Sequence, residues 1–534
     1  MKRAQSSIHQ YDVAIIGAGH NGLVCGALLA KAGKRVVLLE ARQKIGGLSV
    51  TEEIAENVNG SVCAHLVYGL SKRVVSDLRL GKHGVSFVDG FSNTIALNED
   101  GAHLTLTPNV EKTKENISRF STNDANNYEK FEEQVAGFAR VIATLLNEPA
   151  PSMDPSDSAG ERQWHKVRQA LKKLHVDQAA EFLHLLSSNV VDYLDGFFET
   201  DLLKGALAHD AIMGNAMGPR NPGSMWTYLY RRALELSSDP HFRGHPKGGV
   251  GVISDGLGKA ALDAGADIRL GAEVTSLNLI DGRVAGVILE DGQTISAASV
   301  VSSLDPKKTF LELLPAGSTD LGFLTRIRQW RSNGTAAKLN FTLDGIPVFE
   351  GLSEQEVISS RLLVCPSTDY LEFAYNHTKY NQFSDFPALE IVLPTVLDPS
   401  LSTDGHQVMS VLVHYCPDDV EGGWDAARDV FVERVIRAIA TFAPDITDMI
   451  VAGQVLTPAD IAEDFGLTGG HWHHGDLSLD QSLLLRPEAG ANDHETPISG
   501  LYLCGAGSHP GGGITGIPGH NAAQIVISRE RGRR

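Results

Sequence analysis

The sequence has few cysteines, no long apolar run and no excess of basic charge. Its 534 residues contain five cysteines. None of them forms a CxxC pair, so neither a dithiol redox centre nor a zinc ribbon is indicated. No apolar run reaches about 18 residues, so no membrane-spanning helix is predicted. The net charge of −19 disfavours a nucleic-acid partner, because phosphate binding requires a basic surface.

The same absences bear on where the protein acts. A small, odd number of cysteines is typical of a reducing compartment. The first ten residues are polar and lack the apolar stretch of a secretory signal. We therefore expect a cytoplasmic protein, or a mitochondrial matrix protein in a eukaryotic cell. Peripheral contact with a membrane stays open as an alternative.

The first forty residues carry the pattern of a nucleotide-binding unit. Residues 11–16 form a short apolar run, which predicts a buried parallel strand. Apolar residues at helical spacing follow from 23 to 31, and Gly33 provides a helix stop. Residues 35–39 predict a second buried strand. Strand, helix and strand within about thirty residues are the size of one βαβ unit.

The turn between the first strand and the helix is a GxGxxG motif. Gly17 permits the tight turn, Gly19 lets the backbone approach a pyrophosphate, and Gly22 permits close packing of helix and strand. Amides at the start of the helix and the helix dipole favour phosphate groups. Glu40 ends the second strand, at the spacing where a carboxylate receives ribose hydroxyls. The unit therefore predicts a bound dinucleotide.

The residues after Glu40 favour FAD over a nicotinamide dinucleotide. Arg42 and the second glycine turn at Gly46 and Gly47 are similar to flavoproteins in which two loops hold the pyrophosphate. The acid also disfavours a 2′-phosphate. No second GxGxxG follows a predicted strand, because residues 256–258 lie in a helical pattern. One dinucleotide site is expected, so the electrons must leave to oxygen, a quinone or a carrier protein.

The remaining chain alternates between two kinds of pattern. Residues 105–245 are mainly helical, and residues 335–415 predict longer strands with loops. Two hairpin signals, at residues 281–282 and 291–292, stand between β-branched runs. Residues 425–442 predict an amphipathic helix. The C-terminal residues predict a strand at 501–504, a glycine-rich loop and a helix from about Gly519.

This interleaving predicts an α/β fold with a discontinuous Rossmann-type FAD-binding domain and an inserted α+β substrate domain. The expected FAD-binding segments are 9–95, 246–325 and 455–534. The expected substrate or cap segments are 96–245 and 326–454.

The glycine-rich segment 500–521, together with the N-terminal unit, resembles the phytoene desaturase and amine oxidase superfamily of flavoproteins. The likeness is closest to the pyridine nucleotide-disulphide oxidoreductase domain-containing branch, which is related to carotenoid desaturases. It extends through residues 46–53, 248–255, 300–306, 464–470 and 477–481. The name of that branch does not describe this chain, which lacks a redox-active cysteine pair.

The resemblance implies which residues contact FAD. The phosphates would lie near the glycine turn at residues 17–22, and the ribose would bind Glu40. The adenine would lie against the first strand of the hairpin around residues 281–282. The glycine-rich C-terminal loop would approach the FAD chain and the pyrimidine end of the flavin. Leu48 departs from the commoner GGR form of the family. The implied residues are Gly17, Gly19, Gly22, Glu40, Arg42, Gly46, Gly47, Val274, Gly505, Gly507, Gly513, Thr515 and Gly516.

Three residues are candidates for catalysis. Lys338 lies in a predicted strand, and amine oxidases place a lysine on a comparable strand near the flavin; a lysine at the rim of the sheet is the alternative. His509 and His520 flank the C-terminal glycine loop. They could contact substrate, tune the flavin, or bond backbone carbonyl groups.

Two aromatic or histidine-rich segments are open to more than one interpretation. Residues 471–474 contain three histidines, but they lack spaced cysteines or paired carboxylates, so no metal is predicted. A loop beside the flavin is favoured there, with His474 as its contact. Trp226, Tyr228 and Tyr230 could line an apolar channel, although such residues are more often core.

Together these patterns predict an FAD-dependent oxidoreductase that transfers a hydride from a hydrophobic small molecule to the flavin, as a desaturase or dehydrogenase does. An amine or alcohol oxidase is the first alternative, and Lys338 is the residue that favours it. A flavin-binding interaction protein with little turnover is the second.

Overall fold

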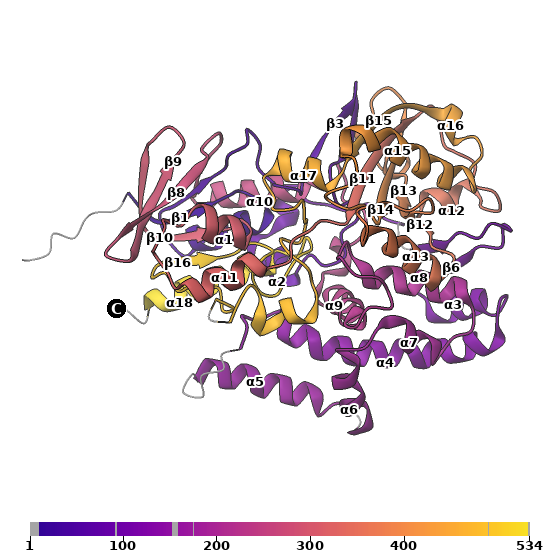
Figure 1. Ribbon diagram of the computed structural model, residues 1–534, viewed down its shortest axis with the longest axis horizontal. Coiled ribbons are helices and arrows are strands. Elements are labelled where there is room, and N and C mark those ends of the chain that lie inside the picture. Colours follow the sequence, from indigo (N-terminus) through magenta and orange to yellow (C-terminus); the bar gives the residue numbers. More distant parts are fainter. Residues whose placement is uncertain (1–9, 91–92, 152–157, 175, 490, 532–534) are drawn as a thin grey trace, which may run out of the picture.

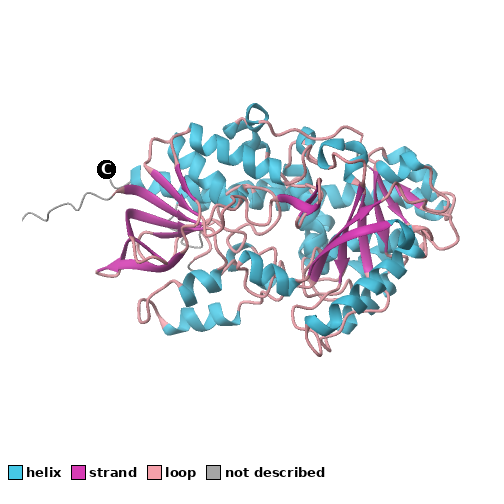
Figure 2. Ribbon diagram, turned by 90° about the horizontal axis from the view of Figure 1, so that it is seen from above, coloured by secondary structure: helices cyan, strands magenta, loops and turns pink. Residues whose placement is uncertain are grey.

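The computed structural model describes residues 10–90, 93–151, 158–174, 176–489 and 491–531. They form two lobes, each containing a seven-stranded sheet. Figure 2 shows the two sheets at opposite ends of the long axis, with helices around both of them. Figure 1 shows that segments from the beginning, the middle and the end of the chain meet in the first lobe.

The first sheet has the strand order β7-β2-β1-β10-β9-β8, and β16 also pairs with β10. Its strands are β1 (Tyr11–Ile16), β2 (Val36–Leu39), β7 (Asp267–Arg269), β8 (Val274–Ile280), β9 (Arg283–Leu289), β10 (Thr294–Ser302) and β16 (Leu501–Leu503). The C-terminal part of β10 is parallel to β1 and β16, whereas its N-terminal part is antiparallel to β9. Three distant segments thereby form one sheet.

Strand β1 is apolar on both faces because both faces of the sheet are covered. Val13 and Ile15 pack under α1 (His20–Lys31), α10 (Gly251–Asp263) and α18 (Ile517–Arg531). Ala14 and Ile16 pack on the opposite side, in a core that includes α11 (Leu321–Gln329). A continuous apolar run is the pattern expected of a parallel strand covered on two sides.

The second sheet has the strand order β15-β11-β14-β13-β12-β5-β6. Its strands are β5 (Asn93–Ala96), β6 (Leu104–Leu106), β11 (Ala336–Leu343), β12 (Ser360–Val364), β13 (Ala388–Val392), β14 (Gln407–His414) and β15 (Ile450–Leu456). One face forms an apolar core with α15 (Trp424–Ala440). The opposite face carries buried polar side chains, which the alternation of a pleated strand keeps apart from that core.

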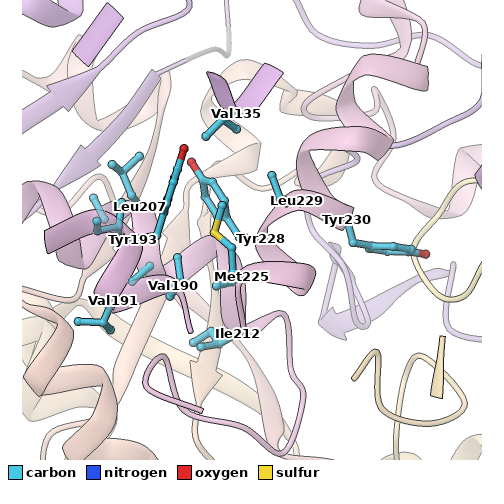
Figure 3. Packing of buried hydrophobic residues seen from close by; sticks show 14 of the residues in the cluster. Val135, Val190, Val191, Tyr193, Leu207, Ile212, Met225, Tyr228, Leu229 and Tyr230 are labelled. Carbon is cyan, nitrogen blue, oxygen red and sulfur yellow. The ribbon is translucent and has the colours of Figure 1, made fainter. Parts of the chain in front are cut away.

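A helical layer packs beside the second sheet. Its core joins α4 (Thr122–Leu146), α8 (Asp201–Ile212) and α9 (Ser224–Ser237). Figure 3 shows Tyr228 near Tyr193, while Tyr230 points away from that group. Trp226, Tyr228 and Tyr230 are all almost fully buried. These aromatic residues form core, so the alternative of an apolar channel is not supported.

The other elements complete both lobes. A two-stranded sheet is formed by β3 (Thr51–Ala55) and β4 (Val58–Ser61). The remaining α-helices are α2 (Lys72–Leu78), α3 (Val110–Ile117), α5 (Ser158–Leu171), α6 (Val176–Leu185), α7 (Val190–Asp195), α12 (Glu354–Ile358), α13 (Thr368–Thr378), α14 (Pro394–Leu397), α16 (Ile446–Met449) and α17 (Pro458–Phe465). Within the described ranges, no helix combines the length and the apolar character needed to cross a membrane.

The predicted α/β class and the discontinuous Rossmann-type domain are confirmed. Strands β5 and β15 belong to the second sheet, so the boundaries drawn at residues 95 and 455 fall inside strands. Helix α18 begins at Ile517, two residues before the expected start. The hairpin of β8 and β9 turns at Asp281 and Gly282, where the sequence indicated it.

Candidate active site

A cavity of about 750 Å³ lies between the two lobes. At one end it is lined by the turn after β1 and by Glu40 after β2. At the other end it is lined by side chains of the second sheet, such as Arg361 and Glu390. One continuous space therefore joins the predicted nucleotide site to the second lobe.

In the turn after β1, packing within the protein explains Gly22 but does not explain Gly19. A Cβ atom at Gly22 would lie 2.3 Å from the carbonyl oxygen of Gly17, so packing explains that glycine. Gly19 has an ordinary φ of −65°, and a Cβ atom there would meet nothing within 4 Å. Since Gly19 lines the cavity, close approach of a ligand explains its lack of a side chain.

Glu40 and Arg42, at the end of the cavity where the nucleotide is predicted, are held by backbone and side-chain contacts. Glu40 is 8% exposed and accepts hydrogen bonds from the amides of Ala18 (2.8 Å) and Arg42 (3.0 Å). The Arg42 guanidinium donates to Glu52 at 2.8 Å and lies over the ring of Phe465 at 4.3 Å. Its buried Nη1 has no acceptor within the protein. A phosphate in this cavity would supply that acceptor.

Most of the predicted FAD contacts line the cavity. The lining residues among them are Gly17, Gly19, Gly22, Glu40, Arg42, Gly46, Gly47, Val274, Gly513 and Thr515. Gly505, Gly507 and Gly516 are outside the described lining. A Cβ atom at Gly505 would lie 2.4 Å from the carbonyl oxygen of Ser303, so this glycine lets two loops approach each other. Ala506 lines the cavity in place of its two neighbours.

Lys338 lies behind the cavity wall. Its side chain is fully buried on β11, and its Nζ donates to the Ser410 hydroxyl and to Nδ1 of His65, 3.3 Å away. Burial lowers the pKa of Lys338 to about 7. The residue that lines the cavity is His65. Lys338 is outside the described lining and contacts the lining residue His65, so its catalytic role stays a prediction.

His509 and His520 also lie outside the described lining of the cavity. His509 is fully buried, and its Nε2 donates to the carbonyl oxygen of Leu145 at 3.1 Å. Nε2 of His520 lies 3.3 Å from a carboxylate oxygen of Asp77. His509 thus bonds a backbone carbonyl group, which is one of the three roles considered for it. A catalytic role of either histidine stays a prediction.

The segment 471–474 forms part of the cavity wall. His471 is bound to Asp476 at 3.1 Å, and His473 donates to the carbonyl oxygen of Met213 at 2.9 Å. His474 lines the cavity, as favoured from the sequence. The fully buried guanidinium of Arg486 donates to the carbonyl oxygens of His473, Gly475 and Ala506. Across the described ranges, no group of three His, Cys, Asp or Glu side chains could hold a metal.

The cavity is also lined by a set of residues that sequence reasoning missed, drawn from the second lobe and from the loop between β4 and α2. We call this set the polar wall; all its members line the cavity. It consists of His65, Tyr68, His209, Arg231, Arg361, Glu390 and His414.

Glu390 is the centre of the polar wall. One of its oxygens receives Nε2–H of His65 at 2.9 Å and the Tyr68 hydroxyl at 3.3 Å, and the other receives the Arg361 guanidinium at 2.6 Å. Burial alone would raise the pKa of Glu390, but Arg361 and His65 hold it well below its usual range. Glu390 is therefore an ionised carboxylate, even though only 4% of the residue is exposed.

A second ion pair lies beside this carboxylate. Arg361 also binds Asp210 at 2.7 Å, and Arg231 lies 3.6 Å from the same aspartate. The Arg231 guanidinium stacks on the ring of Tyr68, 3.6 Å from its centroid. Buried ion pairs give a fold little net stability, because desolvation opposes their attraction. Their position in a cavity wall therefore points to a role in binding or chemistry.

One signal in the sequence could have located the polar face of the second sheet, to which His414 of the polar wall belongs. Strand β11 alternates apolar residues with Lys338, Asn340 and Thr342, although the whole strand is buried. Ser410 and His414 on β14 continue the same polar face. Polar residues at every second position of a buried strand indicate a lined cavity. His65 and Tyr68 lie in a loop, where the sequence carries no such periodicity.

Fold and site together define a class: an oxidoreductase with one dinucleotide site in a Rossmann-type domain, and a second domain that completes the cavity. The chain belongs to the flavin-containing amine oxidoreductase family, which matches residues 22–527. Since the members of this family carry a flavin and the cavity fits it, the chain binds FAD. The resemblance and the cofactor inferred from the sequence are thereby confirmed.

Relatives cover almost the whole chain. Pyridine nucleotide-disulfide oxidoreductase domain-containing protein 2 of Rattus norvegicus is 32% identical over 98% of this chain and 96% of its own length. A limonene dehydrogenase subunit of Castellaniella defragrans is 28% identical, with 98% and 95% covered. A lycopene-forming phytoene desaturase of Pseudescherichia vulneris is 26% identical, with 94% and 96% covered.

Solved structures share the fold. An oxidoreductase from Methanosarcina mazei superposes with a TM-score of 0.60 at 17% identity, covering 97% of this chain and 99% of that one. A triple mutant of putrescine oxidase gives 0.59 at 14% identity, with 98% and 99% covered. At such identities the likeness concerns the fold alone.

Gly19 provides a test of the nucleotide end. We expect Gly19→Ala to fold with an unchanged melting temperature as apoprotein, because its Cβ atom meets no protein atom within 4 Å. The same methyl group would obstruct the phosphates, so FAD affinity should fall about tenfold or more. FAD titration of the apoprotein measures this. Gly22→Ala is the contrast, since its clash with Gly17 should lower the melting temperature itself; equal FAD affinity of Gly19→Ala and wild type would contradict the assignment.

Lys338 makes stability depend on pH in a defined direction. An unfolded lysine titrates at its ordinary pKa of 10.5, and folded Lys338 at about 7. Between these values the unfolded chain holds the additional proton, so stability rises with pH and is lost again as pH falls toward 7. We expect the melting temperature of wild type relative to Lys338→Met to rise by several degrees from pH 7 to 9.5. A difference that is flat or falls with pH would show that Lys338 is not buried as described.

Proposed function

We propose that this protein is an FAD-dependent dehydrogenase of a small organic molecule with a largely apolar body. The observation that carries the proposal is the single cavity that joins the Gly19 turn to the polar wall. A cofactor held at one end then shares its space with a substrate held at the other. Two of the relatives are named as part of a limonene dehydrogenase and as a phytoene desaturase, which supports carbon–hydrogen oxidation.

Bound FAD supplies the acceptor for a hydride, and the protein supplies position and electrostatics. The Gly17 to Gly22 turn, Glu40 and Arg42 would hold the nucleotide part. Met213, Leu234 and Leu412 line the cavity and give a substrate body apolar contacts.

The polar wall fixes the protonation of His65. Because the Glu390 carboxylate only accepts, His65 carries its proton on Nε2, and its Nδ1 accepts from Lys338. Burial, with Lys338 beside it, lowers the pKa of His65 to about 4, so the imidazole is neutral at pH 7. His65 is therefore a neutral, oriented group in the wall, and Lys338 is a positioning residue behind it.

An amine oxidase is the second candidate, and the family supports it. An ammonium substrate would need a carboxylate with a free acceptor at the second-lobe end. Glu390 is the carboxylate of the polar wall, and three donors already occupy it. The geometry therefore favours the dehydrogenase.

The experiment is anaerobic mixing of the FAD-loaded protein with limonene, phytoene, a monoterpene alcohol or putrescine. We expect a terpene or its alcohol to bleach the visible absorbance of bound FAD, and putrescine not to. Dithionite must bleach the same sample, and the Gly19→Ala apoprotein must give no signal. Bleaching by putrescine alone supports the amine oxidase. A sample that dithionite bleaches and none of the four compounds does would favour a flavin-binding protein with little turnover.

A further inference from the structure

In the polar wall the carboxylate oxygens have hydrogen-bond partners, whereas two N–H donors have none. Its carboxylate is occupied, because both oxygens of Glu390 accept from protein donors. Asp210, behind the wall, is likewise bound to Arg361 and lies beside Arg231. The Tyr68 hydroxyl is engaged by Glu390. The carboxylates at this wall are therefore already engaged within the protein, whereas Nδ1 of His414 has no partner.

His209 retains a donor. Its Nδ1 lies 3.1 Å from a guanidinium nitrogen of Arg361. A guanidinium has no acceptor, so this ring nitrogen must accept, and neutral His209 carries its hydrogen on Nε2. Burial lowers the pKa of His209 to about 3, which keeps the ring neutral. Nε2 has no hydrogen-bond partner in the protein, and the residue is only 3% exposed.

Arg231 provides a second unsatisfied donor. Its Nε lies 3.4 Å from Glu235, yet the geometry forms no hydrogen bond, and the atom is buried without an acceptor. The guanidinium is 3.6 Å from Asp210 and stacked on Tyr68. Helices α8 and α9, which carry His209 and Arg231, pack against each other beside the cavity.

The charges of this wall balance. Arg231 and Arg361 are offset by Asp210 and Glu390, and the histidines are neutral. Both carboxylates are already paired with these arginines, so neither is left to hold an ammonium group. A pure hydrocarbon would leave buried N–H groups without acceptors, which is unfavourable. His209 Nε2 and Arg231 Nε are the two donors here that lack a hydrogen-bond acceptor.

We propose that the polar wall binds an acceptor oxygen of the substrate through Nε2–H of His209 and the guanidinium of Arg231. The substrate class is then an oxygenated organic molecule, with a carbonyl or carboxylate at one end and an apolar body. Met213, Leu234 and Leu412 receive that body. This inference rests on the proposed function and narrows it: a substrate made only of carbon and hydrogen does not satisfy the wall.

The test uses binding alone, so it does not depend on turnover. The FAD-loaded protein is titrated with four six-membered-ring probes, namely cyclohexanone, cyclohexanecarboxylate, cyclohexylamine and methylcyclohexane. Binding is followed by the change in the visible spectrum of bound FAD. We expect cyclohexanone or cyclohexanecarboxylate to bind at least about tenfold more tightly than the amine and the hydrocarbon, as one buried hydrogen bond provides. Tightest binding by the amine or the hydrocarbon, or no binding by any probe, overturns the inference.

Two variants of one residue locate the site. His209→Leu should weaken the oxygenated probe about tenfold and leave methylcyclohexane unchanged. His209→Gln keeps an N–H donor at the end of the side chain, so it should retain most of the affinity. His165 is exposed on α5, and His165→Leu is the matched control that should change neither. If His209→Leu does not fold, His209→Gln decides the test. The inference is overturned if His209→Gln binds the oxygenated probe no more tightly than it binds methylcyclohexane.

Probe binding and bleaching of FAD distinguish a failure of the inference from a failure of the proposed function. If the protein binds cyclohexanone selectively but no compound bleaches its FAD, the proposed dehydrogenase fails and the oxygen site stands. If limonene bleaches the FAD while the four probes bind with equal affinity, the dehydrogenase stands and the oxygen site fails.

Discussion

The site depends on the pairing of β10 with two strands from opposite ends of the chain. Its C-terminal half lies parallel to β1 on one side and to β16 on the other. The loops that follow these strands must therefore emerge at the same edge of the sheet, as the carboxyl ends of parallel strands do. The Gly17 to Gly22 turn, the 303–305 loop and the 504–515 loop meet there for this reason. Arg486 then joins the last of these loops to the 473–475 segment through carbonyl oxygens.

The second sheet meets a different constraint. One of its faces must be apolar to pack on α15, while the other must tolerate charge beside a cavity. The alternation of side chains along β11, β13 and β14 satisfies both, because neighbouring residues point to opposite faces. Lys338 and Glu390 thus lie beside Leu339 and Ile391 in sequence, but on the other side of the sheet. The cost of burying the Glu390 carboxylate is offset by its pairing with Arg361, whereas Lys338 has only the neutral partners His65 and Ser410.

The sequence predicts best those parts of the structure whose contacting residues are close together along the chain. The nucleotide end follows local rules: the glycine turn, the second strand and Glu40 all lie within thirty residues, and ten of thirteen implied FAD contacts line the cavity. The catalytic candidates are less predictable. The strand pattern indicates Lys338, but whether a buried side chain faces the cavity or lies behind His65 depends on a loop 273 residues away. His509 and His520 stand beside a glycine loop in sequence, yet their partners, Leu145 and Asp77, come from distant helices.

The most direct test of this account is the number of FAD molecules bound to each chain. Three segments that meet at one edge of a single Rossmann-type sheet form one nucleotide site, and the second lobe contributes none. Purified protein reconstituted with excess FAD, freed of unbound cofactor and then denatured, should release one FAD per chain. Release of no FAD would contradict the assignment of the site, and release of two would contradict the claim that the second lobe serves the substrate.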